Sequence, residues 1–302
     1  MVSVIIPTLN AENNLDALLT SLKGQSIPNE IIVIDSLSSD NTVKTANSFG
    51  AKTIIIKRED FDHGGTRNLA VTHSSGDTIV FLTQDALPGD KYFIENLINP
   101  LEKAGIAAAY GRQIPKIDAR PTEKFARFFN YPETPLVKDR GNISEFGIKT
   151  FFFSNVSSAI RKKEFEELGG FAENLIMNED MLFAARLIFR GYKIAYVPEA
   201  MVIHSHNYSL GQQFKRYFDI GVFLKKNSRE LKYAKADNAG AEFLKSEFTY
   251  LLKNKAYMWL PYSIGEGTSR YVGYHLGMMH TMLPNALRKR ISMHRNYWSN
   301  FK

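Results

Sequence analysis

Short apolar runs rich in Ile and Val alternate with segments of helical period over the first hundred residues. The segment LDALLTSLKGQ (15–25) places apolar residues at helical spacing, and GGTRNLAVTHS (64–74) is expected to begin a helix at a pair of glycines. Strands that are apolar along their whole length and separated by helices predict an α/β fold, with a mostly parallel sheet covered on both faces. The expected strands are SVIIP (3–7), EIIVID (30–35), KTIIIK (52–57) and DTIVFLT (77–83).

Polar residues follow each of these strands. In a parallel α/β sheet, ligands bind beyond the carboxyl ends of the strands, where loops meet helix N-termini. We therefore expect one crevice to collect the polar residues Thr8, Asn10, Asp35, residues 60–63 and Asp85.

The later chain changes character twice. Periodicity is poor from about 91 to 150, beyond a helical YFIENLINPLEKA. FFFSNVSSAIRK (151–162) is interpreted as a strand, and residues 178–198 as a helix ending at Gly191 followed by a strand. Beyond about 210 the chain is helical, aromatic and basic. We expect a first domain at 1–209 and a helical C-terminal extension at 210–302.

Composition limits the partners. The 302 residues include 38 Lys and Arg against 31 Asp and Glu, a net charge of +7, which favours a phosphorylated small molecule, nucleic acid or an anionic membrane surface. The absence of cysteine excludes disulfides and Cys-based metal sites and fits a reducing cytoplasm. The N-terminus does not resemble a signal peptide, and no apolar run is long enough to span a membrane, so we expect a soluble or peripheral protein.

Five segments carry a family resemblance. They are SVIIPTLNAENNL, IDSLSSDNT, HGGTRNLA, FLTQDA and NEDMLFAARLIFRGYKIAYVPEAMVIHSH. In this order, over residues 3 to about 209, they resemble family 2 of the inverting glycosyltransferases, which have the GT-A fold. The resemblance implies nucleotide-sugar binding over about 1–90 and an acceptor side over about 91–209. HGGTRN, TQDA and HSHNYSLGQQFKRYFDIG are most similar to bacterial rhamnosyltransferases of surface polysaccharide synthesis.

The resemblance implies a donor site at the first two strand ends. Asp35 matches the residue that hydrogen-bonds the nucleobase, and Pro7, Thr8 and Asn10 belong to the same pocket. The alternative is that Asp35 caps the following helix, although residues 38–40 already supply cap residues.

The HGGTRN segment supplies two further donor candidates. Its glycines permit close backbone approach, and a helix N-terminus attracts anions. The resemblance implies that Arg67 contacts the donor near its diphosphate, with His63 as a weaker candidate. The alternatives are a solvated arginine on a helix face and a histidine that packs in a loop.

A metal site is implied where the family has Asp-x-Asp. This chain has Thr83, Gln84 and Asp85, so the first carboxylate is replaced and the last, which coordinates the cation, is kept. One Asp can suffice for Mg²⁺, which accepts few protein ligands, and Gln84 is a candidate for ribose or sugar. His204 matches the family's metal-binding histidine and His206 follows it; histidine favours Mn²⁺. Alternatively, both histidines bond to backbone or acceptor.

The acidic pair in NED is the candidate for proton transfer. The resemblance implies that Asp180 is the general base and that Glu179 orients Asp180 or the acceptor. The loop of Gly169, Gly170 and Phe171 resembles the acceptor site. Two carboxylates at a helix start are also ordinary residues that interact favourably with the helix dipole.

The resemblance to rhamnosyltransferases implies transfer of L-rhamnose from dTDP-rhamnose to a growing, lipid-linked polysaccharide. The basic, aromatic tail is interpreted as lying on an anionic membrane or as packing on the catalytic domain or a second subunit. The alternatives are another dTDP- or UDP-sugar donor, a sugar-phosphate nucleotidyltransferase, an inactive transferase-like protein and a nucleic-acid-binding module. Nucleic acid is not expected as a partner, because the sequence contains no recognisable base-stacking or helix-turn-helix motif.

Overall fold

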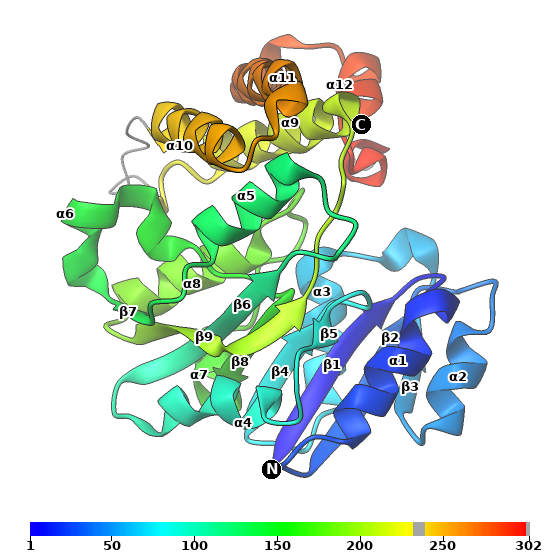
Figure 1. Cartoon of the computed structure of the whole chain (residues 1–302). Coiled ribbons are helices and arrows are strands. Elements are labelled where there is room, and N and C mark those ends of the chain that lie inside the picture. The colour runs from blue at the N-terminus through cyan, green and yellow to red at the C-terminus, as the bar shows by residue number, and fades with distance from the viewer. Residues whose placement is uncertain (232–238, 300–302) are drawn as a thin grey trace. The chain divides into compact units, whose positions relative to one another are not determined.

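The computed structural model describes residues 1–231 and 239–299, and its chain divides into two compact units. The first comprises Met1–Ile114, Tyr131–Glu173 and Glu179–His204, and the second comprises Pro115–Asn130, Asn174–Asn178 and the chain from Ser205 onward. Figure 1 shows the elements of both.

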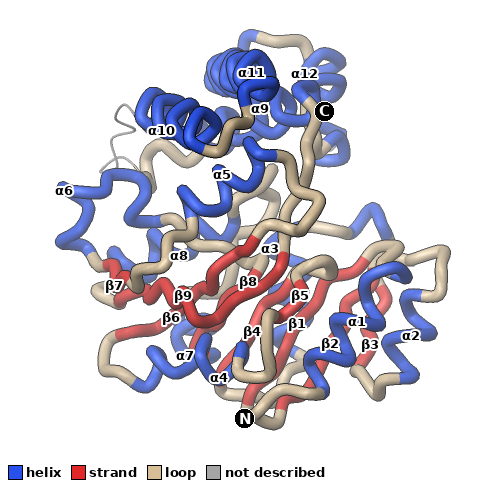
Figure 2. Tube along the Cα trace, in the orientation of Figure 1, coloured by secondary structure: helices blue, strands red, loops and turns tan. Residues whose placement is uncertain are grey.

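A single mixed sheet forms the centre of the first unit, with the order β3-β2-β1-β4-β8-β6-β9-β5 and β7 paired with β9 (Figure 2). The four N-terminal strands β3, β2, β1 and β4 pair in parallel, as expected, while β8 runs antiparallel to both β4 and β6. The bounds are β1 (Val2–Thr8), β2 (Asn29–Asp35), β3 (Lys52–Ile55), β4 (Thr78–Leu82), β5 (Leu87–Pro88), β6 (Ile106–Ile114), β7 (Leu136–Lys138), β8 (Ser157–Arg161) and β9 (Lys193–Ile203).

Helices cover this sheet because their apolar faces match its buried side chains. In α1 the leucines at 15, 18, 19 and 22 repeat at helical spacing and are fully buried in the same cluster as Val4 and Ile6 of β1. Each such side chain contributes about 1.5–3 kcal/mol when it leaves water. The helices of the first unit are α1 (Glu12–Lys23), α2 (Thr42–Ser48), α3 (His63–Thr72), α4 (Phe93–Ile98), α6 (Ile143–Phe146), α7 (Lys162–Glu167) and α8 (Glu179–Phe189).

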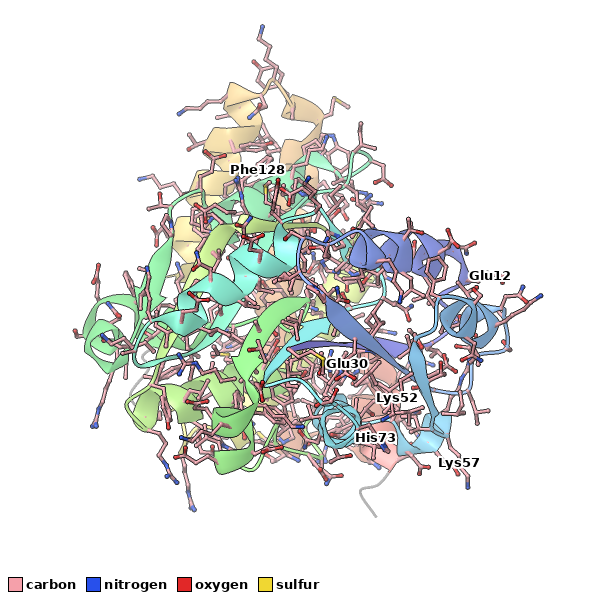
Figure 3. The ribbon with its side chains drawn as sticks, turned by 90° about the horizontal axis from the view of Figure 1, so that it is seen from below. Glu12, Glu30, Lys52, Lys57, His73 and Phe128 are labelled. Carbon is pink, nitrogen blue, oxygen red and sulfur yellow. The ribbon has the colours of Figure 1, made fainter. Side chains whose placement is uncertain are left out.

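Polar side chains at the amino ends of the first strands have structural partners. Glu30 accepts hydrogen bonds from Ser3 Oγ and from the Ser75 N–H, and Lys52 Nζ donates to the His73 carbonyl over 2.9 Å. Glu30, Lys52 and His73 lie together in Figure 3, which views the molecule from below. These bonds join the start of β1, β2 and β3 to the segment that precedes β4.

The structure corrects two sequence expectations. Residues 151–156 are not strand: a 3-10 turn ends at Phe151, and the Ser157 N–H closes a turn onto the Ser154 carbonyl, so β8 begins only at Ser157. Conversely, β6 lies in the segment of poor periodicity and pairs with β8 and β9 inside the sheet. Its alanines and glycine have weak strand propensity. The glycine is required by close packing, because a Cβ on Gly111 would lie 2.3 Å from the Ala200 carbonyl.

The second unit is helical. Its helices are α5 (Pro121–Asn130), α9 (Leu210–Lys226), α10 (Ala239–Lys253), α11 (Leu260–Met278) and α12 (Asn285–Ile291). α9 and α11 cross closely because glycines face the partner backbone: a Cβ on Gly273 or Gly277 would lie 2.3 or 2.1 Å from a carbonyl of α9. Among the described helices, none combines the length and apolar character that crossing a membrane requires.

Candidate active site

The carboxyl ends of β1 and β2 meet at a buried carboxylate. Asp35 Oδ2 accepts a hydrogen bond from Thr8 Oγ1 over 2.8 Å, and Asp35 Oδ1 accepts from the Ser38 N–H over 2.8 Å. Asp40, and not Asp35, bonds to the first turn of α2: Asp40 Oδ1 accepts a hydrogen bond from the Thr42 N–H. Asp35 therefore holds the loop after β2 and does not cap the helix; its contact with a nucleobase stays a prediction.

Two amide side chains bring further loops to the same strand ends. Gln84 Oε1 accepts from the Leu9 N–H over 2.8 Å and Gln84 Nε2 donates to the Leu9 carbonyl over 3.2 Å, which joins the end of β4 to the end of β1. Asn10, at φ 50°, donates its N–H to Ser38 Oγ and accepts from the Ser39 N–H. Pro7, half-buried on β1, is paired with Ile34. Of the residues expected to converge, Thr8, Asn10 and Asp35 are thus connected, directly or through Ser38.

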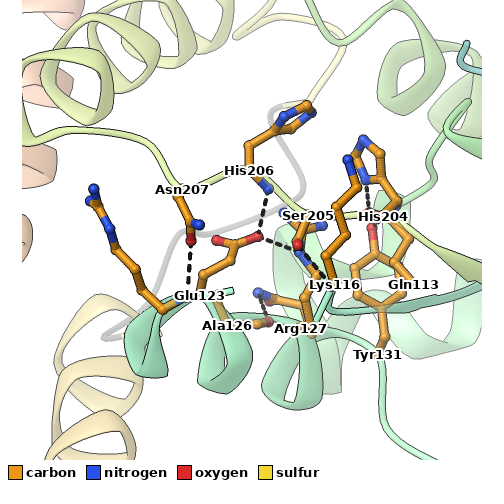
Figure 4. Close-up of polar contacts among 12 residues, drawn as sticks. Gln113, Lys116, Glu123, Ala126, Arg127, Tyr131, His204, Ser205, His206 and Asn207 are labelled. Carbon is orange, nitrogen blue, oxygen red and sulfur yellow. Dashed lines mark hydrogen bonds and ion pairs between the residues drawn. The ribbon is translucent and has the colours of Figure 1, made fainter. Parts of the chain in front are cut away.

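Asp85 and His204 face each other. Asp85 follows β4, His204 directly follows β9, and Asp85 Oδ2 lies 3.5 Å from His204 Nε2; their side chains are 17% and 6% exposed. The other ring nitrogen, Nδ1, lies 2.9 Å from Gln113 Oε1 of β6 (Figure 4). Because Gln113 Nε2 donates to the Tyr131 hydroxyl and to Ser154 Oγ, Oε1 is the atom left for His204. This network assigns the proton to Nδ1 and the lone pair to Nε2.

These two groups fit a divalent cation. A carboxylate oxygen and an imidazole lone pair at 3.5 Å are both electron-rich, so a proton or a cation between them stabilises the arrangement. Two ligands at about 2.1 Å from an octahedral ion lie roughly 3.0 Å apart, so little movement is needed. His206 belongs to the second unit, where its N–H donates to Glu123 over 3.3 Å and its ring stacks on Tyr208.

Arg67 is buried and paired. Asp62 caps α3 by accepting from the N–H groups of Gly64 and Gly65, and one turn later Arg67 Nη1 lies 3.1 Å from Glu179 Oε1. Both side chains are 7% exposed, so Arg67 is not a solvated residue on a helix face. Its contact with a donor stays a prediction.

His63 begins the same helix. Burial lowers the pKa of His63 below its ordinary value; the Glu179 charge opposes this shift and the Arg67 charge adds to it. Its ring packs against Phe61, with 5.1 Å between the ring centroids. The contact of His63 with a donor stays a prediction.

Glu179 and Asp180 begin α8 and titrate in opposite directions. Although burial alone raises the pKa of Glu179, the Arg67 charge and the Asn155 side chain hold it below its usual value. Burial, followed by the Glu179 charge, raises the pKa of Asp180 to about 7. Adjacent carboxyls with separated pKa values are typical of acid–base sites, because one stays ionised while the other exchanges a proton near neutral pH.

Asn155 connects the two carboxyl groups. Its N–H donates to Asp180 Oδ2 over 3.0 Å and its Nδ2 donates to Glu179 Oε1 over 3.1 Å, while its Oδ1 accepts from Ser158 Oγ over 2.9 Å. The turn before β8 therefore fixes both acids.

The glycine loop that resembles an acceptor site is tied to α3. Asn68 Oδ1 accepts from the Phe171 N–H and Asn68 Nδ2 donates to the Phe171 carbonyl, both over 2.9 Å. Gly169 and Gly170 have φ values of 74° and 73°, which other residues rarely adopt. A Cβ on Gly64 would lie 2.2 Å from the Ala172 carbonyl, which explains the first glycine of HGGTRN.

Sequence reasoning missed Gln113, Asn155 and Asn68. Gln113 lies in the strand that was not expected, and Asn155 lies in a segment interpreted as strand. The one usable signal was a polar residue inside an apolar run, as in FFFSNVSS, because buried polar groups need partners.

The sequence matches a known protein family and named relatives. Residues 3–169 match the model of glycosyl transferase family 2. The chain is 43% identical, over its full length and 97% of the relative, to the O-antigen chain rhamnosyltransferase RfbN of Salmonella typhimurium. It is 40% identical to WbaN of Salmonella anatum, another O-antigen chain rhamnosyltransferase, over 99% of this chain and 96% of that one.

Solved structures share the fold at low identity. A mannosyltransferase from Pyrobaculum calidifontis, in complex with GDP-Man and Mn²⁺, matches with a TM-score of 0.58 at 18% identity, covering 99% of this chain and 84% of that one. The TarS fragment 1–349 of S. aureus with UDP-GlcNAc matches with a TM-score of 0.54 at 15% identity, covering 93% and 91%. The expected α/β fold of the GT-A type is thereby confirmed.

Proposed function

The chain belongs to glycosyl transferase family 2, and from that premise we propose that it transfers L-rhamnose from dTDP-β-L-rhamnose to a growing, lipid-linked cell-surface polysaccharide. It is a glycosyltransferase. The observation that carries the proposal is the 43% identity over the whole chain to an O-antigen chain rhamnosyltransferase. The other dTDP- and UDP-sugars are the alternative donors.

Asp180 is the proposed base. Its carboxylate takes the proton of the acceptor hydroxyl, the acceptor oxygen bonds to the anomeric carbon, and the bond from that carbon to the diphosphate breaks, which inverts the configuration. A carboxyl whose pKa is about 7 is matched to this exchange near neutral pH. Glu179 and Asn155 orient it, since Asn155 bonds to both acids.

Asp85 and His204 are the proposed ligands of a Mn²⁺ or Mg²⁺ ion, with His206, two residues along the chain, as a third. When bound, the ion neutralises the charge of the leaving diphosphate. Asp35, Pro7, Thr8, Asn10 and Gln84 are proposed to hold the nucleoside, with His63 and Arg67 nearer the diphosphate. The glycine loop at 169–171 is proposed to receive the acceptor.

The domain organisation remains a proposal as well: a catalytic domain over 1–209 and a helical extension over 210–302. We further propose that the enzyme works in the cytoplasm at the inner face of the cell membrane, where a lipid-linked acceptor is exposed. A homo-oligomer is compatible with this proposed location at the membrane.

The test is donor selection by purified protein. Binding and hydrolysis of dTDP-rhamnose, other dTDP-sugars, UDP-sugars and GDP-mannose would be measured with Mn²⁺, with Mg²⁺ and with chelator. We expect dTDP-rhamnose to be preferred and the cation to strengthen binding. Binding of GDP-mannose alone would reject the donor assignment, and failure to bind any of these would reject the function.

A further inference from the structure

α11 exposes apolar residues and buries charged ones, the reverse of an ordinary surface helix. Its exposed stripe of about 100° contains Pro261, Ile264, Thr268, Tyr271, Val272 and His275, and the stripe continues beyond the helix with Met279 and Met282. None of these side chains is acidic, Lys or Arg. Ile264, Tyr271 and Met282 are 55%, 66% and 74% exposed.

The charged residues of α11 point inward instead. Glu266 and Arg270 form an ion pair of 2.7 Å, with side chains 4% and 12% exposed, and Gln213 of α9 donates to Glu266 over 2.6 Å. A helix that buries its ion pair and exposes its apolar residues does not gain stability from its outer face in water. An apolar partner would therefore stabilise that face.

Cations lie along the chain on both sides of this stripe. Lys253 and Lys255 precede α11 and are exposed, next to Tyr257 and Met258, which is 89% exposed. After α11, the residues Lys289, Arg290 and Arg295 line one hollow with Ala286. From 251 to 299 the sequence contains seven Lys and Arg against one acidic residue, the buried Glu266.

We propose that this outer surface, the exposed stripe of α11 with its cationic flanks, docks on an anionic phospholipid surface. The apolar side chains enter the boundary between headgroups and acyl chains, and the Lys and Arg side chains contact lipid phosphates. A second copy of the chain fits less well, because the cationic flanks of both copies would repel. The helix lies on the bilayer and does not cross it, since no described helix meets the requirements of a span.

Cosedimentation of the full chain with vesicles tests the surface without any sugar donor, so its failure is distinguishable from failure of the proposed transfer. We expect binding to vesicles that contain phosphatidylglycerol, weaker binding to pure phosphatidylcholine, and release by salt. The variant Lys289→Gln/Arg290→Gln should bind about 30-fold more weakly, and Ile264→Ser/Tyr271→Ser should also lose binding. The matched control is Ile55→Ser/Lys57→Gln, an exposed pair in the first unit.

Circular dichroism would establish that each variant is folded. Equal binding by all variants, or no binding by the wild type, would overturn the proposal. A dimer in sedimentation velocity that is lost in Ile264→Ser/Tyr271→Ser, without vesicle binding, would assign the face to a second copy of the chain.

Discussion

Gln113 Oε1 lies 2.9 Å from His204 Nδ1, on the side of the ring opposite Asp85. The bond fixes the tautomer whose Nε2 lone pair faces the proposed ion, as buried partners of metal-binding histidines commonly do. Gln113 is itself held by two hydroxyl partners and is 2% exposed. We infer that Gln113 is a positioning residue, which acts on the proposed ion through the His204 ring.

Gln113→Leu should therefore weaken Mn²⁺ binding by about 10–100-fold, measured by electron paramagnetic resonance of the free ion. Gln113→Glu should retain binding, because a carboxylate also accepts from Nδ1. Tyr131→Phe is the matched control: it removes one partner of Gln113 but keeps the acceptor. Equal Mn²⁺ affinity of Gln113→Leu and wild type would contradict the positioning role.

The first four strands could be predicted because each contains a continuous apolar run, which leaves a clear sequence pattern; β1, β2 and β4 are largely buried, whereas β3 is partly exposed. β6 could not, because it contains alanines and Gly111, which do not favour strands; close backbone contact requires the glycine. Because β6 was not predicted, neither the role of Gln113 nor the tautomer of His204 could be predicted from the sequence. The partner of a buried polar group is chosen by tertiary structure, so Arg67 could be recognised but its pairing with Glu179, 112 positions away, could not.

Asp180→Asn should lower transfer by about 10²–10⁴-fold, because the amide cannot accept the proton. Donor binding should be retained, since the amide oxygen can still accept from the Asn155 N–H. Both quantities are measured on the same preparation, by product formation and by calorimetry. Asp77→Asn, at a 95% exposed carboxylate, is the control and should be neutral. Transfer at the wild-type rate would remove Asp180 from the mechanism.

The pH profile of kcat should fall on the acid side with an apparent pKa near 7, because protonated Asp180 cannot act as a base. Glu179→Gln removes a neighbouring negative charge and should lower the pKa of Asp180, so the acid limb should move to lower pH. Glu166→Gln, at an exposed residue, serves as the control. A limb that stays in place or moves to higher pH would show that another group titrates.

Removing either partner of the Arg67–Glu179 ion pair should lower the stability of the fold. Glu179→Gln or Arg67→Met each leaves one charge buried, which typically lowers the free energy of unfolding by about 3–5 kcal/mol. The double variant should recover much of this loss, because it leaves no unpaired charge. Urea unfolding of the four proteins gives the coupling energy. Additive losses would mean that the pair is not coupled.

The α9–α11 crossing should depend on single glycines. Gly277→Ala places a Cβ 2.1 Å from the Phe218 carbonyl, so the helices must separate and the free energy of unfolding should fall by about 1–3 kcal/mol or more. Gly267→Ala is the matched control on the same helix: its nearest neighbour is a Leu244 methyl group at 3.5 Å, and it should stabilise the helix by up to about 1 kcal/mol. Thermal unfolding measures both. Neither glycine belongs to the exposed stripe, so Gly267→Ala should bind vesicles like the wild type. Gly277→Ala should change vesicle binding only indirectly, by displacing α11 from α9.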